Sequence, residues 1–429
     1  MEESREFKGI WYLPKNRDNA VAGILYYRKK EFIRLELIGS LSNQDNPMKI
    51  FFEDEFGSPQ IIYGESSDAK KITLISCHKR GQSLNLSCTF PLTSFDCQYI
   101  VIGSHISNKS EKCFNKIKVK IPVLSQWLIP TLIEDRFIGE NDLPSDYELK
   151  IPLNQKTNIE VEINSNFKLS LISRSSFSGS INYPEVLKIN QFTLFEIESI
   201  NGKVSLPELL DQSYLFIHFV SLASLTKQEP TEIYLYDYDD FQTYNGENVF
   251  NHNEIIYIIR NENLNNEKIN LLFKYNKIET EFPEIIKKWY SVSNDLAPIR
   301  NHLFNSIQRK SVFTSLDFLI VVQALEGYHR RFVSFQKKGR ITLKDRLEDL
   351  IQIYSSDVLK IKNSNLIVQV VVDTRDYFSH FFARNTKPNL VEGIELLELT
   401  MMLRLLLICC VLDLIGFTKQ KINNIVERF

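Results

Sequence analysis

The hydrophobic pattern of this chain changes its period once, and that change limits the folds open to it. Up to about residue 275, apolar residues occur in short runs and alternations typical of β-strands. From Pro283 onward they recur at steps of three and four, as on one face of a helix. The sequence therefore predicts an α+β multidomain protein, with a mostly antiparallel β region followed by an all-α helical bundle.

The length of 429 residues exceeds what one ordinary core organises, so two or three domains are expected. We place a β-rich domain of one or two sandwiches at residues 1–280 and the helical domain at residues 281–429. A further seam is possible near residues 140–145, after a short helical-looking stretch at 127–136. The segment NENLNNEKIN (261–270) is the best candidate for a linker.

Two segments of the β region predict hairpins. The first has a charged turn at residues 28–31, and the second turns at Asn164-Ser165-Asn166. Further β-branched and aromatic runs predict strands at KITLISC, NKIKVKIPVL, FTLFEIES, YLFIHFVSL, EIYLYDY and EIIYIIR. His218 lies in YLFIHFVSL, and we expect it to be a buried, hydrogen-bonded strand residue.

The C-terminal part predicts several helices. The first carries an apolar face and should kink at Pro298; its periodic residues are Trp289, Val292, Leu296, Ile299, Leu303 and Ile307. Further helices are expected at about 311–335, 343–354 and 363–383, the last ending before Pro388. A final long helix has one apolar stripe, made of Leu399, Met402, Leu403, Leu406, Cys410 and Leu414.

The segment VVDTRDYFSHFF carries the most informative polar residues. A helical projection places Arg375, Asp376 and His380 on the arc opposite the apolar residues of this helix. The apolar arc consists of Ile367, Val370, Val371, Thr374, Tyr377, Phe378 and Phe381, and the rest of the polar arc of Gln369, Asp373 and Ser379. A permanent cation, a carboxylate and an imidazole on one wall suit phosphate chemistry near neutral pH. The alternative is a solvated helix face.

Composition narrows the remaining classes. A net charge of −2 gives no overall bias toward nucleic acid, so any RNA contact must come from a local patch. The six cysteines lack CxxC spacing and paired histidines, which favours free thiols over zinc. The N-terminal segment has no apolar signal core, and LLLICCVL (405–412) is too short to span a bilayer. We expect a cytoplasmic protein without membrane contact.

The helical context and the spacing Arg-x-x-x-x-His resemble the HEPN superfamily, in its ApeA-like branch. Asp376 supplies the polar residue that follows the arginine. LDFLIVVQALEGYHRRF (316–332) looks like the second helix of that branch. GIWYLP, GILYYRKKEFIRLELIG, KITLISC and YIVIGSHI are similar, in order, to the ApeA N-terminal domain. The resemblance covers essentially the whole chain.

The resemblance implies a metal-independent endoribonuclease without a cofactor, acting as a toxin or anti-phage (abortive infection) effector on host RNA. Structured RNA such as tRNA is the expected target, and 2′,3′-cyclic phosphate and 5′-OH ends are the expected products. The β region is then a sensor for a phage-derived activator. The alternative is a catalytically silent HEPN-type module that binds a nucleotide or protein and dimerises.

The chemistry is consistent with the residues. RNA carries its own nucleophile, the 2′-OH, so histidine can move the proton while arginine holds the phosphate. Residues five apart on a helix point about 140° from each other, so we expect Arg375 and His380 to flank the exposed arc from opposite sides. We therefore expect a homodimer in which two copies line a shared cleft; dimers can pair further. Asp376 is expected to orient the imidazole of His380.

A second polar group precedes the motif helix. Glu326 is expected to support the site by holding Arg330 or Arg375, while an ordinary salt bridge is the alternative. Lys337, Lys338 and Arg340, with Arg330, form a basic segment that can bind an RNA backbone. A solvated helix end explains the same residues. His329 is not expected to be catalytic.

Overall fold

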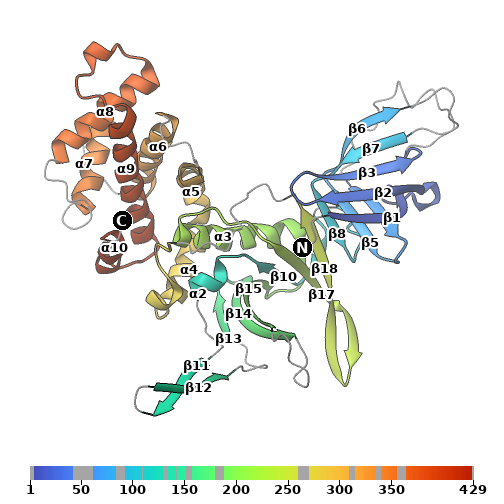
Figure 1. Ribbon diagram of the computed structural model, residues 1–429. Helices are drawn as coiled ribbons and strands as arrows, with labels where there is room; N and C mark the ends of the chain where they lie inside the picture. Colours follow the sequence, from blue (N-terminus) through green and yellow to red (C-terminus); the bar gives the residue numbers. More distant parts are fainter. Residues whose placement is uncertain are drawn as a thin grey trace. The chain divides into compact units, whose positions relative to one another are not determined.

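The computed structural model describes residues 4–41, 61–83, 92–108, 110–128, 134–140, 143–150, 157–178, 188–258, 270–308, 315–333, 340–354 and 364–427. The chain divides into two compact units (Figure 1). Unit 1 comprises residues 1–125, 130–217 and 229–268, and unit 2 comprises residues 126–129, 218–228 and 269–429. The predicted domain boundary at residues 280 and 281 stays a prediction.

The β region of unit 1 is an antiparallel sheet of fourteen strands within the described residues. Its strand order is β13-β14-β15-β10-β17-β18-β8-β5-β4-β1-β2-β3-β7-β6. The strands are β1 (Ser4–Tyr12), β2 (Val21–Arg28), β3 (Phe32–Ile38), β4 (Ile61–Ser66), β5 (Lys71–Ile75), β6 (His78–Ser83), β7 (Leu92–Asp96), β8 (Tyr99–Ile102), β10 (Lys116–Lys120), β13 (Thr157–Glu162), β14 (Phe167–Ser178), β15 (Lys188–Ser199), β17 (Glu232–Tyr244) and β18 (Glu247–Tyr257). Two small sheets pair β11 (Glu134–Glu140) with β12 (Leu143–Lys150) and β9 (Lys112–Phe114) with β16 (Val204–Ser205).

Alternation explains why the central strand β10 forms. Ile117 and Val119 are buried on one face, and Ile117 is in register with Ile197 of β15 and Leu235 of β17. The lysines between them face the other side, where Lys118 pairs with Glu196 at 3.1 Å. A strand with one apolar and one polar face fixes its own register in this way.

Both predicted hairpins are confirmed. β2 and β3 flank the turn at residues 29–31, where the Glu31 amide donates to the Arg28 carbonyl at 3.0 Å. Between β13 and β14, the Asn164 side chain accepts hydrogen bonds from the amides of Asn166 and Phe167 at 2.8 and 3.0 Å. This local capture of the backbone is why asparagine favours such turns.

One glycine is required by packing in the sheet. The fully buried ring of Trp11 lies over Gly64, where a Cβ atom would approach Trp11 to within 2.3 Å. Only glycine leaves room for the indole at this point.

The predicted strand YLFIHFVSL is wrong, because these residues belong to helix α3 (Leu206–Ser224). Phe216, Phe219 and Val220 are all fully buried, and an apolar run of this kind cannot distinguish a buried helix from a buried strand. A helix-start signal was present. Ser205 donates from its amide and its hydroxyl to the Glu208 carboxylate, as in a Ser-x-x-Glu capping box.

Two smaller expectations are also corrected. Of the helical stretch expected at residues 127–136, residues 127 and 128 lie in α2 (Leu124–Leu128), residues 129–133 lie outside the described residues, and Arg136 lies in β11. The single first C-terminal helix is divided at Val292 into α4 (Phe282–Ser291) and α5 (Ser293–Gln308). Pro298 lies inside α5, and the kink expected there stays a prediction. The segment 259–269, which holds nearly all of the expected linker, lies outside the described residues.

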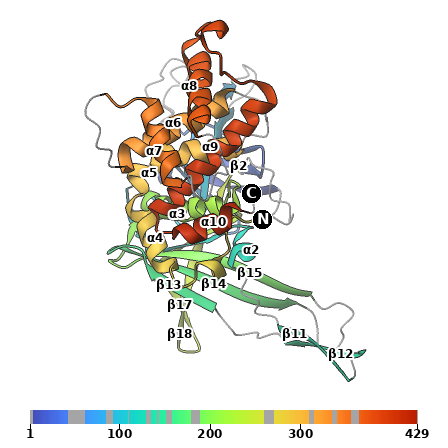
Figure 2. The ribbon, with the colours of Figure 1, turned by 90° about the vertical axis from the view of Figure 1, so that its left-hand side faces the viewer.

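Unit 2 contains the predicted helical bundle. Its remaining helices are α6 (Ser315–Phe332), α7 (Leu343–Tyr354), α8 (Ser364–His380), α9 (Gly393–Leu414) and α10 (Lys419–Val426). Unit 2 also has the short 3-10 turns η2 (Tyr275–Lys277) and η3 (Arg384–Thr386), and unit 1 has η1 (Arg17–Asn19). α6 packs against α5, α7, α8 and α9. The middle of α9 is buried from Leu406 to Leu412, so this helix forms the centre of the bundle. The segment between α8 and α9 lies at one end of unit 2 in both Figure 1 and Figure 2.

Candidate active site at the end of helix α8

Helix α8 buries one face against the bundle. Val368, Val371 and Thr374 are fully buried, as an apolar stripe at helical spacing requires. The projection misplaced two residues. Asp373, expected on the exposed arc, is buried, and Phe381, expected on the apolar arc, is 89% exposed because the helix has already ended.

The helix ends at His380, before Pro388 as predicted. Phe381 takes the left-handed conformation with φ of +55°, and its amide donates to the Tyr377 carbonyl at 3.1 Å. A left-handed residue of this kind turns the chain out of a helix. The short turn η3 follows and brings Lys387 and Asn389 back alongside α8.

The structure brings Arg375 and His380 together within one chain. Arg375 Nη1 donates to His380 Nε2 at 2.7 Å, while His380 is exposed and Arg375 is half-buried. The expectation that they flank the exposed arc from opposite sides is therefore wrong for their end groups. A helical projection gives the direction of Cβ, whereas the long arginine side chain bends back along the surface.

This contact gives Nε2 of the imidazole the role of hydrogen-bond acceptor. A guanidinium can only donate hydrogen bonds, so Nε2 accepts and the ring proton lies on Nδ1. The imidazole in this arrangement is neutral, which is the form of histidine that can take a proton.

Asp376 holds Arg375 rather than His380, contrary to the expectation. Its Oδ1 accepts from Arg375 Nη1 at 3.1 Å and its Oδ2 from Lys387 Nζ at 2.6 Å. Burial raises the pKa of Asp376, but the hydrogen bonds from Lys387 and Arg375 outweigh it and lower the pKa below its usual value. The carboxylate therefore stays charged and anchors the guanidinium.

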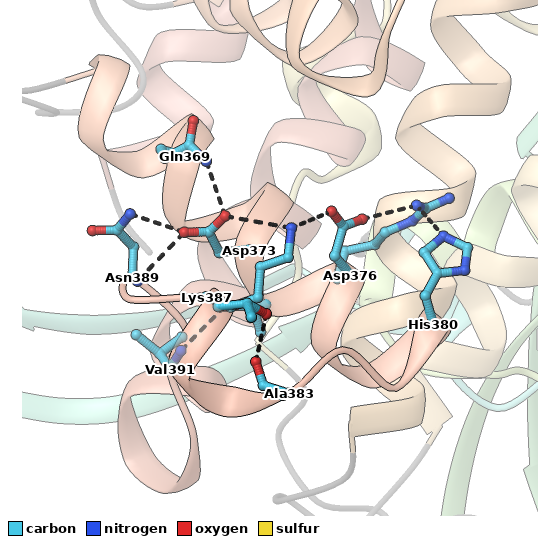
Figure 3. A network of polar contacts seen from close by, with 11 residues as sticks. Gln369, Asp373, Asp376, His380, Ala383, Lys387, Asn389 and Val391 are labelled. Atoms are coloured by element: carbon cyan, nitrogen blue, oxygen red, sulfur yellow. Dashed lines mark hydrogen bonds and ion pairs between the residues drawn. The ribbon is translucent and has the colours of Figure 1, made fainter.

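Lys387 and Asn389 were missed by the sequence reasoning. Lys387 Nζ lies 3.9 Å from the buried carboxylate of Asp373, which also accepts from the side chains of Gln369 and Asn389, each at 2.9 Å (Figure 3). The Val391 amide donates to the hydroxyl of Thr374 at 3.1 Å. These contacts tie the returning segment to α8. The one available signal was the early end that Pro388 imposes on the helix.

Glu326 pairs with Arg330 at 3.6 Å, one of its two expected partners, and with Arg346 at 3.9 Å. His329 is buried between α6 and α7. It contacts Asp349 through Nε2 at 2.9 Å and Arg346 through Nδ1 at 3.1 Å. This histidine joins two helices, which is a structural contact.

Of the expected RNA-binding residues, Arg330 and Arg340 are exposed. Lys337 and Lys338 lie outside the described residues, so the basic segment stays a prediction. In the described part of the chain, no three His, Cys, Asp or Glu side chains group closely enough to hold a metal ion. No described helix has both the length and the apolar character needed to cross a bilayer.

Comparison with known families matches two consecutive parts of the chain. Residues 6–289 match the ApeA N-terminal domain 1, and residues 319–421 match the ApeA-like HEPN domain. No curated protein and no solved structure matches the chain. The second match contains helix α8 with Arg375 and His380, and the first contains the whole described sheet except the first residues of β1. The chain therefore belongs to the ApeA-like HEPN family, with an ApeA N-terminal domain followed by an ApeA-like HEPN domain.

Proposed function

We propose that this protein is a metal-independent endoribonuclease whose cleavage groups are Arg375 and His380. The observation that carries the proposal is the contact of 2.7 Å between their side chains, at the exposed end of α8 and within a HEPN domain. A neutral imidazole beside a permanent cation suits a reaction in which a proton leaves a hydroxyl next to a phosphate.

The reaction uses the 2′-OH of RNA as the nucleophile. His380 Nε2 takes the proton of the 2′-OH, and the 2′-oxygen then bonds to phosphorus as the bond to the 5′-oxygen breaks. Arg375 moves its donors from the imidazole to the phosphate oxygens, which frees Nε2 and neutralises the developing charge. The products are a 2′,3′-cyclic phosphate and a 5′-OH end.

The leaving 5′-oxygen needs a proton from the opposite side of the phosphorus. One chain offers one imidazole beside Arg375, so a second copy related by a two-fold axis supplies the acid: its His380 enters the reaction as the protonated imidazolium, with the guanidinium turned away from Nε2, and gives that proton to the 5′-oxygen. Two exposed apolar side chains of α9, Ile394 and Met401, are suited to such a contact between copies. The homodimer is thus part of the proposal.

The family also suggests how the nuclease is controlled and which RNA it cuts. A ribonuclease without restraint damages its own cell, and the ApeA N-terminal domain accounts for most of the chain. We propose that it restrains the nuclease until a phage-derived activator binds, and that structured host RNA such as tRNA is then cut. The basic segment with Arg330, Lys337, Lys338 and Arg340 is proposed to contact the RNA backbone.

The test compares wild type with Arg375→Ala and His380→Ala on total tRNA in EDTA. Each substitution should lower cleavage by about 10²–10⁴-fold, and the wild-type products should carry cyclic phosphate ends. Arg28→Ala and His78→Ala remove an exposed arginine and an exposed histidine of unit 1, and should cleave like wild type. Cleavage by the wild type that both site variants match refutes the assignment.

A further inference from the structure

Two phenylalanines directly follow His380 and are exposed. Phe381 is 89% exposed and Phe382 is 48% exposed. Single apolar residues on a surface are ordinary, but two large rings in sequence beside a proposed active site are a candidate contact surface.

The backbone at Phe381 adds a second, independent observation. Its φ of +55° lies in the left-handed region, where bulky residues are rare and where glycine or asparagine usually ends a helix. The side chain gains almost no burial in return for this strained conformation. The reversal at this position is needed to end α8, but a phenylalanine is not, and a bulky residue kept in a strained conformation is typical of functional positions.

Phe382 is held against the site and leaves Phe381 as the outer ring. The Phe382 ring centroid lies 6.1 Å from that of His380, nearly perpendicular to it, and Lys387 Nζ lies 5.0 Å above the Phe382 ring. Phe382 is thus packed by the lysine that also holds Asp376. Phe381 directly follows His380 in the sequence, and its ring lies in solvent.

The charges of the site make an aromatic contact important. Arg375 pairs with Asp376, Lys387 with Asp373 and Asp376, and Arg384 with Glu392. Each of these three cations therefore already has a carboxylate beside it, and the site offers little surplus positive charge to a polyanion. Stacking of bases on aromatic rings supplies affinity that does not depend on net charge.

We propose that Phe381 stacks on an unpaired base next to the scissile phosphodiester, so that the enzyme selects single-stranded or looped RNA. The inference rests on the proposed ribonuclease function and deepens it. A base inside a duplex is already stacked on its neighbours, so an outward ring beside His380 reaches a base only where the strand is unpaired.

Binding separates this inference from catalysis. His380→Ala protein is titrated into a short single-stranded oligoribonucleotide that carries 2-aminopurine, whose fluorescence falls when it stacks on an aromatic ring. Adding Phe381→Asn should weaken binding by about 5- to 100-fold and abolish the quenching, whereas Phe381→Trp should retain both. Phe241→Asn, which removes an exposed phenylalanine of unit 1, is the matched control and should bind normally.

Stability distinguishes a functional ring from a structural one. Asparagine tolerates the left-handed conformation, so Phe381→Asn should melt at the same temperature as its parent or higher. A lower melting temperature together with unchanged binding overturns the inference.

Three further outcomes are separable. If Phe381→Asn shifts sedimentation from dimer to monomer and quenching is unaffected, the ring contacts a second copy and the inference is wrong. If wild type cleaves RNA and Phe381→Asn in the wild-type background cleaves with the same KM, the inference fails while the ribonuclease proposal stands. If wild type cleaves no RNA under any activating condition but 2-aminopurine is quenched, the ribonuclease proposal fails and stacking by Phe381 remains.

Discussion

At the scale of single residues, the site is a chain of contacts from Lys387 through Asp376 and Arg375 to His380. Each member fixes the next. Lys387 is only 17% exposed and lies between two carboxylates, and the hydrogen bond it donates is the largest contribution that lowers the pKa of Asp376. Lys387 is therefore a positioning residue, which acts on the imidazole through two other side chains.

Replacement of Lys387 should change how activity depends on pH. In Lys387→Ala, burial is opposed only by Arg375, so the pKa of Asp376 rises and the carboxylate is protonated at a higher pH than in wild type. Arg375 then loses its anchor, and activity should fall at a higher pH on the acidic side of the profile. The pH dependence of RNA cleavage measures this.

Two controls accompany that profile. Lys387→Arg keeps the cation and should restore the wild-type profile. Lys287→Ala removes another lysine that pairs with a carboxylate, Glu284 of α4, and should leave the profile unchanged. A Lys387→Ala profile that superimposes on the wild type removes Lys387 from the account.

At the scale of elements, helix α3 carries a histidine that should make folding depend on pH. Burial, followed by the positive charges of Arg300 and Lys227, lowers the pKa of His218 to about 4. Its ring packs on Phe304, with ring centroids 5.1 Å apart. Among the described residues, its Nδ1 has no hydrogen-bond partner. His218 was expected to be a hydrogen-bonded strand residue, but it lies in a helix and its imidazole is neutral near pH 7.

The stability of the protein should therefore fall in mild acid. The unfolded chain protonates His218 near pH 6.5, whereas the folded chain resists protonation until about pH 4. The free energy of unfolding is thus complete above pH 6.5 and falls by up to about 3 kcal/mol as the pH drops to 4. Urea unfolding measured from pH 7 to pH 4 should show a smaller loss of unfolding free energy for His218→Gln than for wild type. An equal loss in the two proteins would contradict this role of His218. His78→Gln, at an exposed histidine, is the control and should behave like wild type.

Sequence patterns predicted those elements that are decided locally. The turn at Asn164 is held by its own side chain, and α7 and α8 follow from amphipathic spacing and Pro388. Helix α3 was mistaken for a strand because apolar residues lie on most sides of it, so that neither the helical nor the strand periodicity can be recognised in its sequence. The contact of Lys387 with Asp376 depends on the reversal after Phe381, which spacing along one helix does not describe.

At the scale of the whole molecule, the proposed reaction needs two copies of the chain for each cut. The proposed base and acid are the same residue, His380, in two subunits, and the ApeA N-terminal domain is proposed to control when they meet. Arg375 and His380 already contact each other within one chain. What dimerisation adds is therefore the second imidazole, on the opposite side of the phosphorus.

Mixing active and inactive copies tests this claim most directly. Wild-type protein is combined with His380→Ala protein, the subunits are left to exchange, and RNA cleavage is measured at constant total protein. If both imidazoles are needed, an equal mixture retains about a quarter of the wild-type activity, because about a quarter of randomly paired dimers carry two histidines. Retention of about half shows that each chain cuts alone and contradicts the shared active site.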